Sequence, residues 1–403
     1  MKILLLNSLS NKEDFPPNPP LNLLYLASSL RDKHDVWILD LDALKYDSNQ
    51  VKNRLIKENP DVIGITCTTL SYNNMVKTCH IIKQHLKKTI LVIGGVHVTV
   101  KPKESLKETK ADYAIVGEGE ISFSKLLENP KKHPKIIEGK KRIDLDDKVF
   151  PSRDILEPSI FSYVGNAPRF TNNQTVMMWS RGCPFNCLFC SHAIYKGQKT
   201  IFRSPTNIIE ELKELKRIGI KELFVYDDEL IGLGEKQSAW LEQVCKLIVK
   251  NKLDDLIFKC QGRCSDTINL NLLKLMKRAG FKCIMWGCES GSDNVLKAIR
   301  KGTSVEQIKR AIRLCKQAGI KAWMFLIVGN YTETENDLKK TIQLVKETKP
   351  NYVQVTYSTP YPGEYLDLCE KENLILENDK SKWNTHIPVV KTQHLTEEQL
   401  VFY

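Results

Sequence analysis

Three cysteines lie close together in the segment MMWSRGCPFNCLFCSH, which spans residues 177–192. They are Cys183, Cys187 and Cys190, and they follow a short apolar run. A closed zinc site needs four ligands, so His192 would have to be the fourth in this single loop. Three unrelated buried thiols are a second interpretation, which the tight spacing on a Gly/Pro loop disfavours. An iron–sulfur cluster fits better, because three thiolates around four irons leave one iron open for chemistry.

Composition places these thiols in an ordinary globular protein. The chain has 403 residues, of which 42% are hydrophobic and 27% charged, and this length predicts two or three domains. The first apolar run, Ile3–Leu6, is too short for a signal peptide or a membrane span, so we expect a cytoplasmic protein. The net charge of +12 is spread over many lysines, which favours a solvated surface over a nucleic-acid partner.

In the first half of the chain, short apolar runs alternate with helical patterns. This alternation predicts an α/β domain over residues 1–130 with a doubly wound, Rossmann-like parallel sheet. The expected strands are Ile3–Leu6, Val36–Leu41, Val62–Thr66, Ile90–Ile93 and Tyr113–Val116. Ligands of such sheets bind beyond the carboxyl ends of the strands, where this half places its glycines and hydroxyls. Residues 131–172, rich in Lys and Pro, are expected to be a linker.

The alternation resumes near residue 175. Six strand–helix units predict a partial (β/α)6 barrel of the TIM type over residues 173–370, followed by a short C-terminal extension over 371–403. The expected strands are Val176–Trp179, Glu222–Tyr226, Ile257–Gln261, Lys282–Trp286, Lys321–Ile327 and Tyr352–Thr356. Ser204-Pro205 and Ser304-x-x-Gln307 are typical helix starts.

Polar residues follow each of these six expected strands. Barrels of this type keep their chemistry at the carboxyl ends of the strands, so one site built from six distant segments is predicted. Its members are Arg181, Asp227, Asp228, Gln261, Arg263, Glu289, Ser290, Gly329, Asn330, Tyr357 and Tyr361.

The spacing Cys-x3-Cys-x2-Cys after a first barrel strand, with Phe189 before the last cysteine, strongly resembles the radical S-adenosylmethionine superfamily. The resemblance implies a [4Fe-4S] cluster on Cys183, Cys187 and Cys190, with S-adenosylmethionine chelating the remaining iron. It implies that the reduced cluster splits S-adenosylmethionine and that the resulting 5′-deoxyadenosyl radical takes hydrogen from an unactivated carbon. An electron donor such as ferredoxin or flavodoxin is implied as a partner.

Downstream segments also resemble those in which the superfamily binds S-adenosylmethionine. FVYDDEL stands where many members have a Gly-Gly-Glu segment that holds the amino group of the cofactor. Asp227 and Asp228 are expected to accept hydrogen bonds from that amino group instead. Arg263 is expected to pair with the carboxylate of the cofactor. The resemblance thus implies contacts from Phe189, Asp227, Asp228, Arg263, Glu289, Ser290 and Gly329. Tyr357 and Tyr361 are candidate catalytic residues on the substrate side.

The first domain resembles the cobalamin-binding domains that precede some radical S-adenosylmethionine enzymes. TTL at 68–70 and Gly94-Gly95 are similar to their Ser-x-Leu and Gly-Gly parts, and the whole match covers about residues 1–365. It implies cobalamin contacts from Thr66, Thr68, Leu70, Gly94, Gly95 and Glu118. Asp32-Lys33-His34 begins like the cobalt-ligating Asp-x-His-x-x-Gly, but Trp37 replaces the glycine, so we interpret it as a chance surface match. A docking domain without a cofactor is the alternative.

Three functions follow from these patterns. The first is methylation of an unactivated carbon of an unknown substrate, whether small molecule, lipid or peptide, and this is the function we expect. The second keeps the cofactors but carries out a cyclisation or rearrangement without methyl transfer. The third is a non-catalytic iron–sulfur or zinc module that binds nucleic acid, which the expected convergence of polar residues on one barrel face disfavours.

Overall fold

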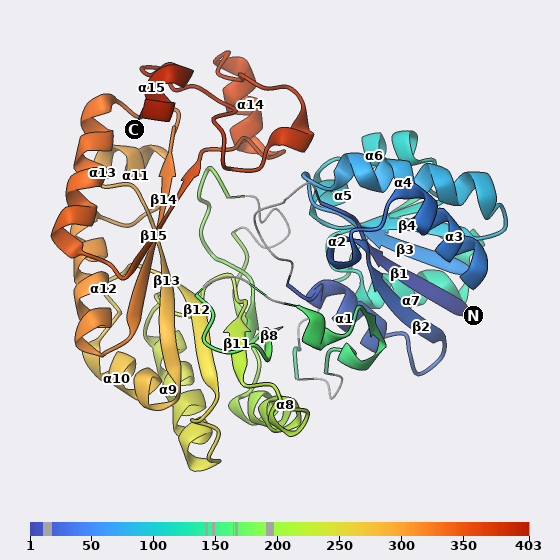
Figure 1. The fold of residues 1–403 in the computed structure, drawn as a ribbon, viewed down its shortest axis with the longest axis horizontal. Helices are drawn as coiled ribbons and strands as arrows, with labels where there is room; N and C mark the ends of the chain where they lie inside the picture. The colour runs from blue at the N-terminus through green and yellow to red at the C-terminus, as the bar shows by residue number, and fades with distance from the viewer. Residues whose placement is uncertain are drawn as a thin grey trace.

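The computed structural model describes residues 1–10, 18–141, 144–146, 150–163, 165, 168–190 and 197–402. Two α/β units lie side by side, the N-terminal unit in blue and cyan and the second in yellow and orange (Figure 1). The C-terminal helices α14 (Glu364–Lys371) and α15 (Glu397–Phe402) lie above them in red (Figure 1). Within the described ranges, every helix is too short or too polar to span a bilayer.

The N-terminal unit is built on a seven-stranded sheet of order β6-β5-β4-β3-β1-β2-β7, in which every pair is parallel. Helices cover both faces, so Ile3 to Leu6 are fully buried, as expected for a parallel sheet. The central strands are β1 (Lys2–Asn7), β2 (Asp35–Asp40), β3 (Val62–Thr66), β4 (Ile90–Gly94) and β5 (Tyr113–Val116). The helices are α1 (Leu21–Ser28), α2 (Leu41–Leu44), α3 (Ser48–Glu58), α4 (Tyr72–His85), α5 (Val96–Val100), α6 (Pro102–Thr109) and α7 (Glu120–Glu128). The predicted doubly wound fold is confirmed.

The segment predicted to be a linker supplies both edge strands of this sheet. β6 (Ile136–Glu138) pairs with β5, and β7 (Leu156–Glu157) pairs with β2. An ion pair of 2.7 Å between Arg54 Nη2 and Glu157 Oε2 ties β7 to helix α3. The N-terminal unit therefore extends beyond residue 130 and includes much of the connecting segment.

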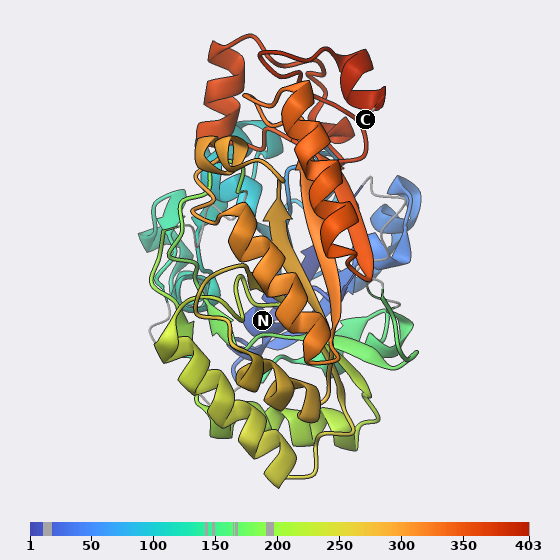
Figure 2. The same cartoon turned by 90° about the vertical axis from the view of Figure 1, so that its left-hand side faces the viewer.

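The second unit is an open, six-stranded parallel barrel of strand order β15-β14-β13-β12-β11-β8, which confirms the predicted partial (β/α)6 fold. Its strands are β8 (Gln174–Met177), β11 (Glu222–Val225), β12 (Ile257–Arg263), β13 (Phe281–Glu289), β14 (Lys321–Val328) and β15 (Tyr352–Tyr357). Its helices are α8 (Pro205–Arg217), α9 (Glu235–Lys250), α10 (Leu270–Arg278), α11 (Asp293–Ala298), α12 (Val305–Gln317) and α13 (Glu335–Thr348). Figure 2 shows α12 and α13 on the outer side of the strands.

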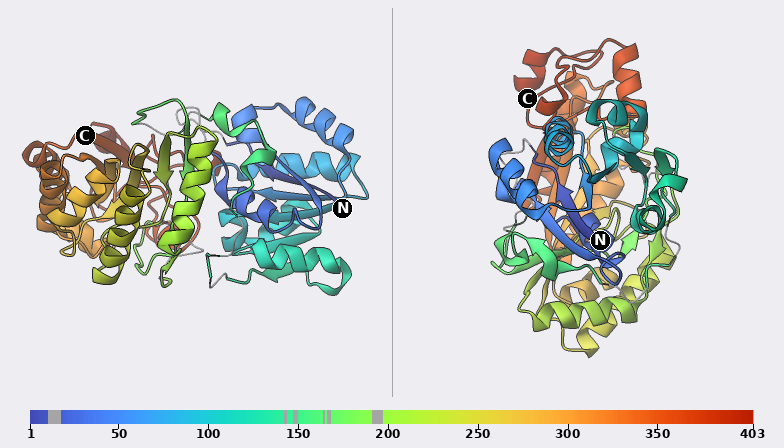
Figure 3. Two further views of the ribbon diagram at one scale, coloured as in Figure 1. Left: turned by 90° about the horizontal axis from the view of Figure 1, so that it is seen from below. Right: turned by 90° about the vertical axis from the view of Figure 1, so that its right-hand side faces the viewer.

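Alternation along the strands divides the side chains between two environments. On β14, Met324 and Leu326 point into the core between strands and helices, whereas Trp323 and Phe325 face the inside of the barrel. Leu21 from the start of α1 packs against the same inner cluster, so the N-terminal unit covers part of the open side of the barrel. Figure 3 shows the early, green part of the barrel next to the N-terminal unit.

The two predicted helix starts are present. The Ser204 side chain accepts a hydrogen bond from the backbone N–H of Asn207, with Pro205 at the first helical position of α8. Ser304 and Gln307 form a reciprocal capping box at the start of α12. These caps fix the residues at which α8 and α12 begin. They therefore also fix where the loops that lead into these helices end.

A fully buried ion pair anchors the segment that enters the barrel. Lys259 Nζ lies 2.8 Å from Glu222 Oε1, and both side chains are 0% exposed. The second oxygen of Glu222 accepts hydrogen bonds of 2.8 Å from the backbone N–H groups of Phe170 and Thr171. Lys259 also donates to the carbonyl oxygen of Pro168 at 3.0 Å. One charge pair therefore connects β11 and β12 to the incoming chain.

Replacement of Glu222 by Ala leaves the Lys259 ammonium buried without its partner. We expect the free energy of unfolding of the apo-protein to fall by about 3–5 kcal/mol, measured by chemical denaturation. The control is Glu242→Ala, which removes the partner of the exposed Lys246 and is expected to cost about 1 kcal/mol or less. Equal losses in the two variants would contradict this assignment.

Candidate functional site

The three cysteines lie on a loop that is closed by a short antiparallel strand pair. β9 (Ser180–Arg181) pairs with β10 (Ile201–Phe202), so the intervening loop leaves and returns at one place. Gly182 starts the loop with a φ of 103°. A Cβ atom there would lie 2.8 Å from the carbonyl oxygen of Lys199, so the tight loop entry requires glycine.

A cavity of about 300 Å³ lies at the carboxyl ends of the barrel strands and brings the predicted segments together. Cys183, Cys187, Phe189 and Cys190 line it. Its charged lining residues are Asp228, Glu229, Arg263, Glu289 and Lys301. Its hydroxyl-bearing lining residues are Thr356, Tyr357, Ser358, Thr359, Tyr361 and Thr385. Six of the eleven predicted strand-end residues line the cavity, namely Asp228, Gln261, Arg263, Glu289, Tyr357 and Tyr361, whereas Arg181, Asp227, Ser290, Gly329 and Asn330 do not.

Arg263, at the end of β12, is a buried cation with an unused donor. Its guanidinium carbon lies 3.6 Å from the centre of the Phe185 ring, and Nη1 lies 3.9 Å from Cys187 Sγ. The residue is 2% exposed, and Nη2 has no hydrogen-bond partner among the described residues. Buried donors normally find acceptors, so this arginine is suited to bind an anionic group inside the cavity.

A second cation in the cavity wall is already paired. Lys301 Nζ lies 2.7 Å from Glu289 Oε1, and both side chains are almost fully buried. Burial opposes the charge on Lys301, but Glu289 and Glu229 outweigh it and raise the pKa of the ammonium. Glu289 has a φ of 65°, at the point where the pairing of β13 with β14 shifts register. The irregular strand end thus turns Glu289 towards Lys301.

Glu229 is the carboxylate of this site with the most altered titration. Burial raises its pKa to about 7, while Lys301 and Arg263 lower it. Neighbouring Asp228 also lines the cavity and accepts a hydrogen bond of 3.1 Å from the backbone N–H of Gly182. These two carboxylates and the two cations make the cavity suitable for a zwitterionic ligand such as an amino acid group.

The donor set of the loop fits an iron–sulfur cluster. Three thiols line the cavity, and the adjoining cation Arg263 can hold a further ligand beside them. No three Cys, His, Asp or Glu side chains in the described part of the chain converge closely enough to share a single metal ion. A cluster does not require such convergence, because each thiolate binds a different iron. His192, the fourth ligand of the zinc interpretation, lies outside the described residues.

Three predicted S-adenosylmethionine residues do not line the cavity. The carboxylate of Asp227 accepts hydrogen bonds from Trp179 N at 2.7 Å and Ser180 Oγ at 2.6 Å. Ser290 is fully buried and its hydroxyl accepts a hydrogen bond of 3.2 Å from the backbone N–H of Ser292. Gly329 donates its N–H to Glu333, 2.7 Å away. Each of these groups stabilises the end of its own strand.

The C-terminal extension closes one side of the cavity. Thr385 lines the cavity and accepts a hydrogen bond of 2.8 Å from the backbone N–H of Tyr357. Its φ of 69° is a strained value for a β-branched residue, which the surrounding contacts must hold in place. Tyr361 donates its hydroxyl to the carbonyl oxygen of Trp383 at 3.2 Å, and Trp383 packs against Leu70 of the N-terminal unit. The extension therefore connects the cavity to the first domain.

Glu229, Lys301 and Thr385 are site residues that the sequence analysis did not identify. Glu229 follows Asp228 directly, so its position just after the second barrel strand was a usable signal. Lys301 follows helix α11 and not a strand end, so its position in the sequence did not mark it as a cavity residue. Thr385 lies beyond the last strand, and no pattern in the sequence marks it.

The carboxyl edge of the N-terminal sheet carries the predicted cobalamin residues. Gly95 follows β4 with a φ of 99°, and a Cβ there would lie 2.5 Å from Cys67 O and 2.6 Å from Thr66 Oγ1. At Gly94 a Cβ would meet only Ile115 O, at 3.7 Å. Thr68 is exposed at the same edge. The end of β3 therefore requires glycine at position 95, whereas Gly94 leaves bare backbone at a strand end, which fits the close approach of a cofactor.

His97 offers an unpaired ring nitrogen at this edge. Its Nδ1 lies 3.1 Å from Thr69 Oγ1, its ring stacks on Tyr72 at 4.0 Å, and the residue is 1% exposed. Nε2 has no hydrogen-bond partner in the described part of the chain. Burial lowers the pKa of His97 to about 4, so the ring is neutral at physiological pH. Near this edge the structure therefore buries one polar atom that has no partner among the described residues.

The remaining predicted residues of this domain have protein partners. Leu70 is buried against Trp383 of the C-terminal extension. Glu118 lies 3.5 Å from Arg181, the residue that precedes Gly182 and the cluster loop. Both residues are therefore at the junction between the two units.

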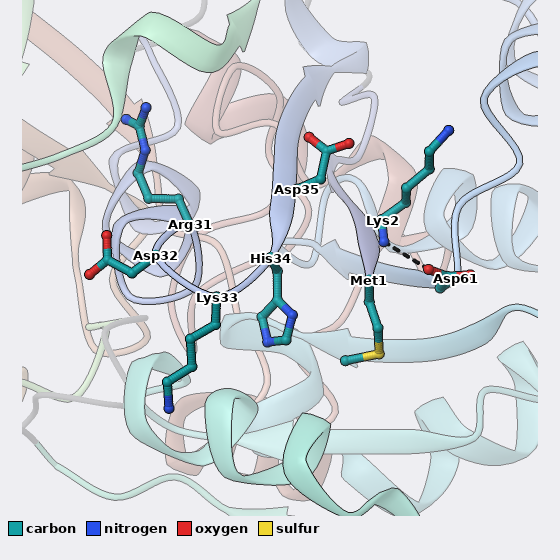
Figure 4. Close-up of a pocket in the computed structure, with 8 residues that line it drawn as sticks. All are labelled: Met1, Lys2, Arg31, Asp32, Lys33, His34, Asp35 and Asp61. Atoms are coloured by element: carbon teal, nitrogen blue, oxygen red, sulfur yellow. Dashed lines mark hydrogen bonds between the residues drawn. The ribbon is translucent and has the colours of Figure 1, made fainter.

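His34 lies far from that edge. Figure 4 shows it in an open hollow with Met1, Arg31, Asp32, Lys33 and Asp35, where Lys2 N donates to Asp61 Oδ2 at 2.8 Å. The hollow is at the amino ends of β1 and β2, opposite the carboxyl edge. Asp32-Lys33-His34 is thus on the wrong side of the sheet to ligate a cofactor at Gly94 and Gly95.

Comparisons with known proteins agree with these two sites. Residues 177–345 match the Radical SAM superfamily, and residues 16–127 match the B12 binding domain. The chain is 33% identical over 402 residues to the uncharacterized methyltransferase PH0819 of Pyrococcus horikoshii. This match covers 95% of this chain and 85% of the Pyrococcus protein. It is 26% identical over 417 residues to the anaerobic magnesium-protoporphyrin IX monomethyl ester cyclase of Rubrivivax gelatinosus, covering 95% of this chain and 72% of the cyclase.

A solved structure shares the fold over both units. The cobalamin-dependent S-adenosylmethionine radical enzyme OxsB, with aqua-cobalamin and S-adenosylmethionine bound, matches with a TM-score of 0.80 and 19% identity. The match covers 98% of this chain and 65% of the OxsB chain. Together with the identity to the Pyrococcus methyltransferase, these findings show that the chain belongs to the cobalamin-dependent radical S-adenosylmethionine enzymes, whose cofactors are a [4Fe-4S] cluster, S-adenosylmethionine and cobalamin.

Proposed function

We propose that this enzyme transfers a methyl group to an unactivated carbon of its substrate. The observation that carries the proposal is that one chain combines three features. They are a loop with three thiols, a cavity in which Arg263 has an unused donor, and a sheet edge with two glycines at which we expect cobalamin to bind. The Pyrococcus relative, matched over most of both chains, is named a methyltransferase. When bound, the reduced cluster and S-adenosylmethionine supply a 5′-deoxyadenosyl radical, and cobalamin supplies a methyl group.

The residues of the cavity have complementary roles in this proposal. Cys183, Cys187 and Cys190 hold the cluster. The unused donor of Arg263 binds the carboxylate of S-adenosylmethionine, and Asp228 with Glu229 accepts hydrogen bonds from its ammonium group. Lys301 pairs with Glu289 and holds it in the wall, and Phe189 packs beside the cluster. The protein thus orients the amino-acid end of S-adenosylmethionine through its carboxylate and its ammonium group.

In the N-terminal domain, Gly94 and Gly95 give the nucleotide tail of cobalamin access to the backbone. Thr66 and Thr68 supply hydroxyl groups at the neighbouring strand end. Leu70 and Glu118 contribute from the junction, where they also contact the second unit.

The substrate side of the cavity is rich in hydroxyl groups. Tyr357, Tyr361 and Thr385 line it, and the tyrosines are the candidate catalytic residues. Burial raises the pKa of Tyr361 to about 12, so its hydroxyl stays protonated and can donate a hydrogen bond. We place the enzyme in the cytoplasm, where a ferredoxin or flavodoxin delivers the electron.

The Rubrivivax relative gives a second candidate function. It is a cyclase that matches 95% of this chain, so a ring closure or rearrangement without methyl transfer uses the same architecture. The two functions differ in the fate of S-adenosylmethionine. Methyl transfer consumes one molecule as a methyl donor and a second as the radical source, whereas cyclisation requires only the second.

The products formed from S-adenosylmethionine with a CD₃ methyl group distinguish the two functions. We expect anaerobic, reduced holoenzyme to release S-adenosylhomocysteine, to label its cobalamin with CD₃ and to form 5′-deoxyadenosine, all detected by mass spectrometry. Formation of 5′-deoxyadenosine alone would favour the cyclase. The Cys187→Ala variant is expected to lose iron and 5′-deoxyadenosine formation, whereas Cys245→Ala, buried on α9, is the control that keeps both.

Glu229 and Asp227 can be separated by isosteric substitutions. Glu229→Gln removes a charged acceptor and is expected to weaken S-adenosylmethionine binding to the reconstituted protein by about 10-fold or more, measured by calorimetry. Asp227→Asn is expected to leave this affinity unchanged and to lower the free energy of unfolding by about 1–3 kcal/mol, because its carboxylate holds Trp179 and Ser180. The opposite pattern of affinities would assign the ammonium group to Asp227.

The two glycines of the cobalamin edge are expected to respond differently to alanine. Gly95→Ala places an alanine at a positive φ, and its Cβ clashes with the carbonyl oxygen of Cys67. We therefore expect the free energy of unfolding of the apo-protein to fall by about 1–3 kcal/mol. Gly94→Ala has room in the apo-protein and is expected to keep its thermal stability while binding less cobalamin, measured by visible absorbance. Normal corrinoid uptake by Gly94→Ala would remove this glycine from the site.

A further inference from the structure

A buried arginine joins the cluster loop to the N-terminal domain. Arg181 is the last residue of β9 and lies two positions before Cys183. Its Nη2 lies 2.7 Å from Glu120 Oε1 and its Nη1 lies 3.5 Å from Glu118 Oε2, with all three side chains at most 9% exposed. The guanidinium carbon also lies 5.2 Å from the centre of the Tyr25 ring. One side chain of the barrel is therefore surrounded by the other domain.

The contacts of Arg181 come from three separate parts of that domain. Tyr25 lies on α1, Glu118 follows β5, and Glu120 begins α7. β5 is the direct neighbour of β4, whose end carries Gly94. Glu118 and the two glycines thus share the carboxyl edge of one sheet, so Arg181 reaches the edge at which cobalamin is proposed to bind.

The backbone of Arg181 is equally constrained on the barrel side. It pairs with Ile201 of β10, which closes the cluster loop. The next residue, Gly182, donates its N–H to the cavity carboxylate of Asp228 at 3.1 Å. A displacement of Arg181 must therefore move the entry to the loop, and with it the first thiol.

Other contacts attach the two units to each other. Arg153 donates to the carbonyl oxygen of Val176 at 3.0 Å and pairs with Glu211 at 2.8 Å. Leu21 packs inside the barrel mouth. Attachment of the units does not depend on Arg181 alone. Buried arginine–carboxylate groups with such geometry are better at fixing register than at adding stability.

We infer that Arg181 is a positioning residue that fixes the cluster loop relative to the cobalamin edge. By holding this distance, it sets how S-adenosylmethionine is divided between methyl donation and radical formation. The second statement rests on the proposed methyl transfer, whereas the first concerns only the separation of two cofactor sites.

Pulsed dipolar EPR tests the first statement in the holoenzyme. The reduced cluster and cob(II)alamin each carry unpaired electrons, so their coupling reports the distance between them. We expect Arg181→Met, which keeps an unbranched side chain but removes the charged guanidinium group, to broaden or shift the distance distribution. The ratio of S-adenosylhomocysteine to 5′-deoxyadenosine, measured with S-adenosylmethionine alone, is expected to change by about tenfold or more. Arg181→Lys retains the charge but cannot form the bidentate contacts of a guanidinium group. We expect its distance distribution and product ratio to lie between those of the wild type and of Arg181→Met.

The matched control is Arg153→Lys, a substitution of another buried arginine whose contacts are with Glu211 and Val176. It is expected to keep the wild-type distance and product ratio. An Arg181→Met holoenzyme with both quantities unchanged would overturn the inference. If that variant does not fold, Glu120→Gln carries the same test, because it weakens one partner without emptying the space. A changed distance in an enzyme whose wild type forms no S-adenosylhomocysteine would support positioning and reject methyl transfer.

Discussion

The proposed chemistry depends on a set of cluster ligands that is short by one thiolate. Three cysteines lie on one loop, which β9 and β10 close. Among the described residues, no further cysteine lines the cavity. Next to the thiols, the Arg263 guanidinium has a donor without an acceptor. A cluster with one open iron and a cation ready for a carboxylate together specify a small chelating zwitterion. The fold of the barrel brings these groups to one cavity.

Buried charge is the main feature of the cavity wall. Glu289 and Lys301 neutralise each other there, and the ligand recognition that we propose falls to the carboxylates of Asp228 and Glu229 and to the guanidinium of Arg263. The hydroxyl-rich remainder of the cavity is completed by Thr385 from the C-terminal extension. Because the same extension packs Trp383 against Leu70, the substrate side and the cobalamin domain are parts of one continuous packing arrangement.

Strong periodicity made both folds predictable, and the cysteine spacing made the cluster predictable. Elements with few residues are not predictable in this way: β6 and β7 are too short to show a period, so the sequence predicts a linker where they lie. Site residues at regular strand ends, such as Arg263, were found from position alone. Lys301 and Thr385 do not follow a barrel strand directly: Lys301 comes after helix α11 and Thr385 lies in the C-terminal extension, so strand-end position could not identify them. The contacts of Arg181 depend on domain packing, which no local pattern encodes.

The most direct test of the central claim is the coordination of the open iron. Electron–nuclear double resonance on the reduced cluster, with S-adenosylmethionine carrying ¹⁵N in its amino group and ¹⁷O in its carboxylate, reports whether these atoms bind iron. The account predicts hyperfine couplings from both labels in the wild-type holoenzyme. A cluster that shows neither coupling while S-adenosylmethionine is bound would contradict it.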